Sequence, residues 1–136
     1  PKDLSSEVWT NRVGAERWQQ SFPWQTLRDA GAHLVFGSDW PVVTQNPYIG
    51  IYSALSRQPW SPAMPIQRQS LQDTLAGYTR DGAYTEFQEG VKGQLRRGLY
   101  ADLVLLDRDI EQTEVEAIKE MGAALTICGG RVVYEA

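Results

Sequence analysis

The sequence lacks several of the residues and patterns on which small functional domains often depend. It has a single cysteine, Cys128, so no disulfide can form within the chain. It has a single histidine, His33, and no HxH, HExxH or Cys/His cluster, so it cannot build a zinc site from its own usual ligands. Thirteen Lys and Arg against seventeen Asp and Glu give a net charge of −4, which argues against a general nucleic-acid binder.

Targeting and nucleotide-binding signals are also missing. No apolar stretch approaches the roughly 20 residues that a membrane helix needs, so we expect no membrane association. No Gly-rich phosphate loop precedes a helix, which weakens the interpretation as a small nucleotide-binding domain. The chain begins Pro1-Lys2-Asp3-Leu4, without an initiator Met or a signal-peptide core, and we expect that an N-terminal portion is missing. The low cysteine content alone leads us to expect a cytoplasmic protein.

The first part of the chain resembles one half of a parallel α/β unit. Pro23 is suited to open a helix that Gly31 would close in a left-handed cap. Residues 33–36, His-Leu-Val-Phe, are short and apolar and predict a buried strand that ends at the Gly-Ser-Asp-Trp-Pro run of residues 37–41. Only one such strand precedes residue 90, and a parallel strand needs a neighbour. The sequence therefore indicates an incomplete α/β domain.

Three more helical stretches follow. Asn46-Pro47 predicts a helix start, with the helix running to about Arg57. A loop with three prolines separates it from residues 70–73, Ser-Leu-Gln-Asp, which resemble a capping box with Asp in place of Glu. Helical character resumes from residue 81 to about residue 89, after an expected break near Gly82.

The last third has β character. Residues 101–107 predict a strand, and the acidic residues 111–122 a short helix or loop. Residues 124–128 and 131–134 are β runs joined by Gly129-Gly130, a strong hairpin signal because a type I′ turn needs positive φ at both central positions. We expect a small antiparallel sheet.

Asp39 is the most informative candidate for chemistry. It directly follows the predicted buried strand, where α/β proteins place catalytic groups. A carboxylate there can bind a metal ion and accept a proton from water. On the local pattern alone, an Asp that merely caps its turn is an equally good interpretation. His33 lies at the opposite end of the same strand, so we expect it to be structural.

Aromatic residues near Asp39 suggest a pocket. The five tryptophans are more often core or interface anchors than a binding site. Trp40 is the exception, because it adjoins Asp39 and could form a pocket wall. Val42 and Trp60 are further candidates for lining a substrate pocket.

Four stretches in order carry a resemblance to a known family. They are residues 27–47 with the Phe-Gly-Ser-Asp-Trp-Pro-Val run, 78–84, 93–107 and 126–134. Together they resemble the amidohydrolase superfamily, and within it amidohydrolase family 3, which includes N-substituted formamide deformylase-like and exoenzyme-regulator-like proteins. Gln94 stands where the family usually has serine, away from the expected chemistry.

The resemblance implies an α/β fold built on a metal-dependent hydrolase (β/α)8 barrel followed by a small β-sandwich. Residues 1–89 would be the C-terminal portion of the barrel, with its last strand and helices. Residues 90–136 would be the C-terminal strands of the sandwich, or composite, domain. Since a whole barrel takes about 250 residues, the chain would be a C-terminal fragment.

The resemblance also implies a function. The parent protein would hydrolyse carbon–nitrogen bonds in small amide or formamide substrates with a divalent metal, zinc by resemblance. Asp39 would lie at the metal and carry a proton from the attacking water to the leaving nitrogen. Most metal ligands would come from earlier strands, so we expect the isolated chain to be inactive.

One alternative remains open. A non-enzymatic binding or regulatory module derived from an amidohydrolase would carry the same motifs. Open sheet edges would favour self-association of such a piece, so a homo-oligomer would not by itself identify a biological partner.

Overall fold

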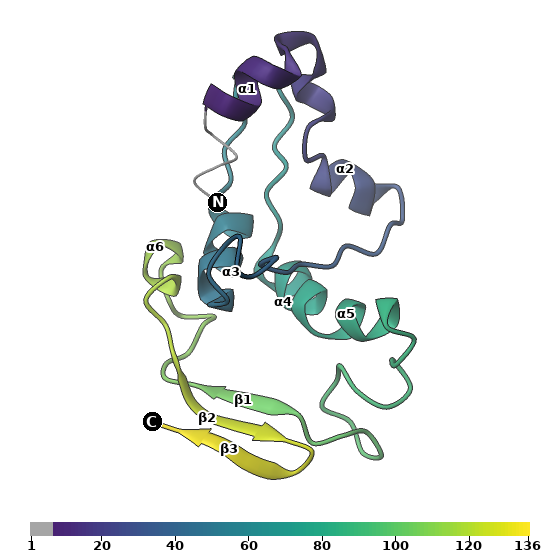
Figure 1. Ribbon diagram of the computed structural model, residues 1–136, viewed down its shortest axis with the longest axis vertical. Coiled ribbons are helices and arrows are strands. Elements are labelled where there is room, and N and C mark those ends of the chain that lie inside the picture. Colours follow the sequence, from purple (N-terminus) through teal and green to yellow (C-terminus); the bar gives the residue numbers. More distant parts are fainter. Residues whose placement is uncertain (1–6) are drawn as a thin grey trace.

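The chain is a mixed helix-and-strand structure in which most of the helices precede the sheet along the sequence. The computed structural model describes residues 7–136. Its elements are α1 (Glu7–Val13), the 3-10 helix η2 (Ala15–Gln20), α2 (Trp24–Asp29), α3 (Pro47–Ser56), α4 (Leu71–Tyr78), α5 (Arg80–Thr85), β1 (Leu103–Leu106), α6 (Val115–Ile118), β2 (Ala123–Cys128) and β3 (Arg131–Glu135). Figure 1 shows α3–α5 between the α1–α2 end and the sheet. This agrees with the expected α/β class at its coarsest level. The division at residues 89 and 90 into barrel and sandwich portions stays a prediction.

Aromatic rings and one arginine hold the α1–α2 end to the loop that follows α3. Phe22 makes edge-to-face contacts with Trp9, Trp24 and Trp60, with ring centroids 5.7–6.4 Å apart. The guanidinium of Arg57 lies 4.7 Å from the centroid of the Trp24 ring. Burial lowers the pKa of Arg57, because desolvation disfavours its charged form. The aromatic faces offset part of that cost by cation–π attraction.

The helix starts that the sequence predicts are confirmed. The Asn46 side chain accepts a hydrogen bond from the backbone N–H of Tyr48 at 3.0 Å, with Pro47 in the first turn. At α4, Ser70 Oγ accepts from the Asp73 N–H at 3.0 Å and donates to the Asp73 carboxylate at 2.7 Å. Each cap satisfies a backbone donor that the helix itself leaves without a partner. Helix α2 likewise lies between Pro23 and Gly31, whose φ is 88°.

The expected helix break near Gly82 is wrong. The chain leaves helical geometry at Thr79, where φ is −128° and ψ is −88°, and Gly82 lies inside α5. Helix α5 also ends at Thr85, before the expected residue 89. It ends there because Phe87 adopts a left-handed φ of 58°, and the N–H of Gln88 bonds the carbonyl of Ala83 at 2.9 Å. That pattern terminates a helix even without glycine.

The hydrophobic core lies between α3 and α6 and extends to Leu106 at the end of β1. Its buried members are Tyr48, Ile51, Ile110, Ile118 and Met121, with Tyr52, Leu55, Leu71, Leu75, Tyr78 and Leu106 packed around them. The core therefore joins the helical part to the β part.

The sheet has the antiparallel order β1-β2-β3. Gly129 and Gly130 have φ values of 57° and 77°, which confirms the predicted hairpin between β2 and β3. Each strand pair has one register shift, and all five residues of the edge strand β3 are exposed.

The predicted buried strand at residues 33–36 is wrong. Within residues 7–136 the three strands are all C-terminal to residue 102, and residues 32–38 form an extended segment outside any sheet. The physical reason is the shortage of neighbours, since an isolated strand has no ladder of hydrogen bonds. The segment instead contacts α4, where the N–H of Phe36 bonds the carbonyl of Gly77 at 3.3 Å.

Candidate functional site

Asp39 lies in an exposed turn at the end of the extended segment. Its backbone φ is 52°, a left-handed conformation that is uncommon for a non-glycine residue. Its carbonyl accepts a hydrogen bond from the N–H of Val42 at 2.8 Å, which closes the turn. Trp40 and Val42 are 65% and 75% exposed. The turn therefore presents a carboxylate, an indole ring and an aliphatic side chain together to solvent.

The Asp39 carboxylate faces solvent. Across residues 7–136 we find no hydrogen bond or ion pair to its oxygens, and it is exposed. Such a carboxylate can accept a proton or bind a cation. Trp60 lies apart in the aromatic cluster, with its ring centroid 6.0 Å from that of Trp18.

Phe36 anchors the segment that carries this turn. Its ring contacts those of Trp24 and Tyr78, each with centroids 5.7 Å apart. A Cβ at Gly77 would lie 2.6 Å from Phe36 Cδ2, so only glycine permits this approach. Burial raises the pKa of Tyr78, because desolvation disfavours the phenolate.

His33 lies at the start of the same segment and pairs with α5. Its Nδ1 is 3.6 Å from Asp81 Oδ1, and its ring stacks on that of Tyr84 with centroids 4.4 Å apart. Arg80 Nε donates to the same Asp81 oxygen at 2.8 Å, and this hydrogen bond is the main cause that raises the pKa of Arg80. The position of His33 agrees with the structural role expected for it. Sequence reasoning missed Asp81, because no local pattern marks an Asp in the first turn of a helix as buried.

Two buried glutamines hold α2, on the N-terminal side of the segment. Gln67 Oε1 accepts from the backbone N–H groups of Gln25 and Thr26 at 2.8 and 3.1 Å, which caps α2 from a distant loop. Gln69 Oε1 accepts from Arg28 Nε at 2.8 Å. Sequence reasoning missed this network as well, since the partners are more than 40 residues apart.

The described residues do not complete a metal site by themselves. Within residues 7–136 no three His, Cys, Asp or Glu side chains come together to hold an ion. Asp39 supplies one carboxylate, whereas His33 is turned to Asp81. A catalytic zinc ion usually takes three protein ligands, so any metal beside Asp39 needs ligands other than these.

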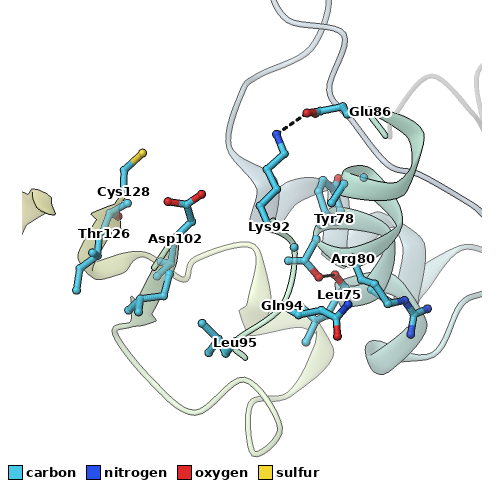
Figure 2. A pocket seen from close by; sticks show the side chains of 18 of the residues that line it. Leu75, Tyr78, Arg80, Glu86, Lys92, Gln94, Leu95, Asp102, Thr126 and Cys128 are labelled. Carbon is cyan, nitrogen blue, oxygen red and sulfur yellow. Dashed lines mark hydrogen bonds and ion pairs between the residues drawn. The ribbon is translucent and has the colours of Figure 1, made fainter. Parts of the chain in front are cut away.

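A separate groove of about 1120 Å³ lies between the α4–α5 helices and the sheet. Figure 2 shows the Lys92 side chain extending to the Glu86 carboxylate, with which it forms an ion pair. Asp102 and Cys128 lie on the opposite side of the groove. The hydrogen bond to Glu86 raises the pKa of Lys92. None of Asp39, Trp40 and Val42 lines this groove, so it is distinct from the candidate site.

The sequence profile of the amidohydrolase family matches residues 4–134. The chain belongs to this family. That match confirms the family resemblance of the four motifs. No solved structure matches the chain.

Curated relatives agree with the family assignment. The chain is 34% identical over 129 residues to Protein LONG AFTER FAR-RED 3 of Arabidopsis thaliana, covering 90% of this chain and 22% of that protein. It is 27% identical over 135 residues to the putative amidohydrolase YtcJ of Bacillus subtilis, covering 92% and 25%. It is 27% identical over 116 residues to an N-substituted formamide deformylase of Arthrobacter pascens, covering 84% and 21%. The chain therefore spans a quarter or less of the length of these relatives.

Residues 7–136 contain no membrane-spanning helix. Within the part that the structure describes, each helix is too short or too polar to cross a bilayer.

Proposed function

We propose that the whole protein is a metal-dependent hydrolase of carbon–nitrogen bonds in small, non-peptide amides, with formamide-type compounds as the first substrates to test. The proposal is supported by family membership and by relatives named as an amidohydrolase and a formamide deformylase. The observation that carries it in this chain is the exposed Asp39 carboxylate on a left-handed turn, which has no hydrogen-bond or ion-pair partner among residues 7–136. Residues held in rare backbone conformations occur often at functional sites.

Asp39 takes a proton from the attacking water and delivers it to the leaving nitrogen. A carboxylate without a hydrogen-bond donor among residues 7–136 suits this role, because its oxygens are open to water and to the leaving group. Proton transfer of this kind contributes about 10²–10⁴-fold to a rate. Trp40 and Val42 line one wall of the substrate pocket, where their exposed apolar surfaces would be covered by the substrate.

A divalent metal, zinc on the family resemblance, would supply Lewis-acid activation of the substrate or water. Asp39 is the one residue here that we assign to it. The remaining ligands lie outside this chain, and the 136-residue chain alone does not hydrolyse amides. We also propose that the whole protein is cytoplasmic, and that the chain alone self-associates.

The test uses the protein as its gene encodes it, assayed against N-substituted formamides and other small amides with and without a chelator. We expect metal-dependent hydrolysis, and a loss of about 100-fold or more in kcat on Asp39→Asn. The matched control is Glu89→Gln, which removes an exposed carboxylate elsewhere and should leave kcat unchanged. Full activity in Asp39→Asn would overturn the assignment. Absence of hydrolysis in the metal-loaded wild type would favour the alternative, a non-enzymatic binding or regulatory module.

A further inference from the structure

The geometry points to Asp81 as a positioning residue for Asp39. Its buried carboxylate, together with the Tyr84 ring, holds His33 and so fixes the segment that ends in the Asp39 turn. This inference rests on the proposed function of Asp39. The contact that it assigns to Asp81 is made with His33, six residues before Asp39 along the chain.

The first step is the burial of Asp81. The residue is 1% exposed, whereas the side chains of Arg80 and His33 above it are about half exposed. A buried carboxylate is costly unless it is paired with donors or cations. Asp81 Oδ1 accepts a hydrogen bond from Arg80 Nε at 2.8 Å, and His33 Nδ1 lies 3.6 Å from the same oxygen. His33 is the one that comes from a different element, so this pairing ties the extended segment to α5.

The second step is the stacking of His33 on Tyr84. The two rings are inclined by 18° with centroids 4.4 Å apart. Residues 81 and 84 are three apart on α5 and so lie on the same helix face. His33 is therefore held at its edge by the carboxylate and on its face by the phenol ring, which defines both its place and its orientation.

The third step concerns the hydrogen bonds near Asp39. Phe36 gives a second anchor on α4, three residues after His33 and three before Asp39. Among the residues that the structure describes, the single hydrogen bond we find in residues 37–43 is the internal one from Val42 to Asp39. On the N-terminal side of the turn the segment thus has two anchors, and Asp81 with Tyr84 makes the first of them.

The inference can be tested on the 136-residue chain by fluorine NMR with 5-fluorotryptophan. The chain has five tryptophans, and each signal can be assigned with a Trp→Phe variant. Trp40 adjoins Asp39, and Trp24 contacts the Phe36 ring. In Asp81→Asn we expect the Trp40 signal to shift and sharpen as the turn gains freedom, with a smaller shift at Trp24. The signals of Trp9 and Trp18, in the aromatic cluster, should stay in place.

Three further variants separate positioning from general stability. His33→Phe keeps a ring on Tyr84 but removes the partner of Asp81, and it should also move the Trp40 signal. Tyr84→Phe keeps the stacked ring, so it should leave the Trp40 signal in place. Asp107→Asn is the control, because it breaks a carboxylate–arginine pair outside the segment and α5, with Asp107 Oδ1 3.2 Å from Arg108 Nε. An unmoved Trp40 signal in both Asp81→Asn and His33→Phe would overturn the inference. Equal displacement of all five tryptophan signals in Asp81→Asn and His33→Phe would also overturn the inference, because it would reveal a role in overall folding.

Activity gives an independent readout in the whole protein. A displacement of about 1 Å at a reacting group can cost about 100-fold in rate, so Asp81→Asn and His33→Phe should lower kcat by tenfold or more with little change in KM. If Asp39→Asn proved fully active, the proposed function would fail while the fluorine result on positioning still stood. A mobile turn with unchanged kcat would overturn the positioning role and leave the proposed function intact.

Discussion

Replacing Gly77 with alanine places a methyl group in the contact between α4 and the segment that carries Asp39. The added Cβ would lie 2.6 Å from Phe36 Cδ2 and 3.0 Å from the carbonyl oxygen of Leu34. Both distances are shorter than van der Waals contact, so either the Phe36 ring or the segment backbone must move. Moving the ring weakens its contacts with Trp24 and Tyr78.

Two opposing effects set the size of the change. Overpacking a filled site costs about 1–3 kcal/mol, and each aromatic pair that is lost costs a further ~0.5–1.5 kcal/mol. Alanine gains up to about 1 kcal/mol over glycine as a helix former. We therefore expect Gly77→Ala to lower the free energy of unfolding by about 1–3 kcal/mol, as measured by urea denaturation.

Gly82→Ala is the matched control for this prediction. It lies inside α5, and its added Cβ would meet its nearest neighbour, the carbonyl oxygen of Gly77, at 3.9 Å. That variant should be as stable as the wild type or up to about 1 kcal/mol more stable. In a Phe36→Ala background the penalty of Gly77→Ala should become smaller, because the clashing ring is gone and the close contact with the Leu34 carbonyl oxygen is the one that remains. Equal stability of Gly77→Ala and Gly82→Ala would refute the close-packing argument.

Two more predictions concern α4. Ser70→Ala removes the side chain that caps the helix and bonds Asp73, so the free energy of unfolding should fall by about 1 kcal/mol. The control is Ser56→Ala at the end of α3, which should change the free energy of unfolding little. Urea denaturation measures both variants. Burial raises the pKa of Tyr78 above its ordinary value of 10, so the folded state keeps the phenol proton after the unfolded chain has lost it. Stability should therefore be intact below pH 10 and fall as the pH rises above it, and Tyr78→Phe should flatten that fall in thermal melts; an unchanged alkaline slope would contradict the argument.

Local signals predicted much of the fold. The caps at Asn46 and Ser70 and the Gly129-Gly130 hairpin depend on residues a few positions apart, and the structure has all three. These are interactions that a short stretch of sequence specifies on its own.

Features that depend on distant partners were not predictable. Residues 33–36 have strand composition, but strand formation requires a neighbour that the described residues do not supply. The burial of Asp81 and the capping of α2 by Gln67 arise from segments about 40 or more residues apart. The candidate site shows the same division, since Asp39 was predicted from its local run, whereas the contacts of His33 and Phe36 with α5 and α4 were not.

The register shift in the β2–β3 pair has a consequence for how the chain behaves at high concentration. It makes the outer edge of β3 irregular, because a bulge turns some backbone groups of the strand away from a regular ladder. Arg131 and Glu135 also place charges at the two ends of this edge. Fibril growth needs flat, uniformly spaced edges that stack without interruption. The edge of β3 is a poor template for such growth, even with Val132, Val133 and Tyr134 exposed along it.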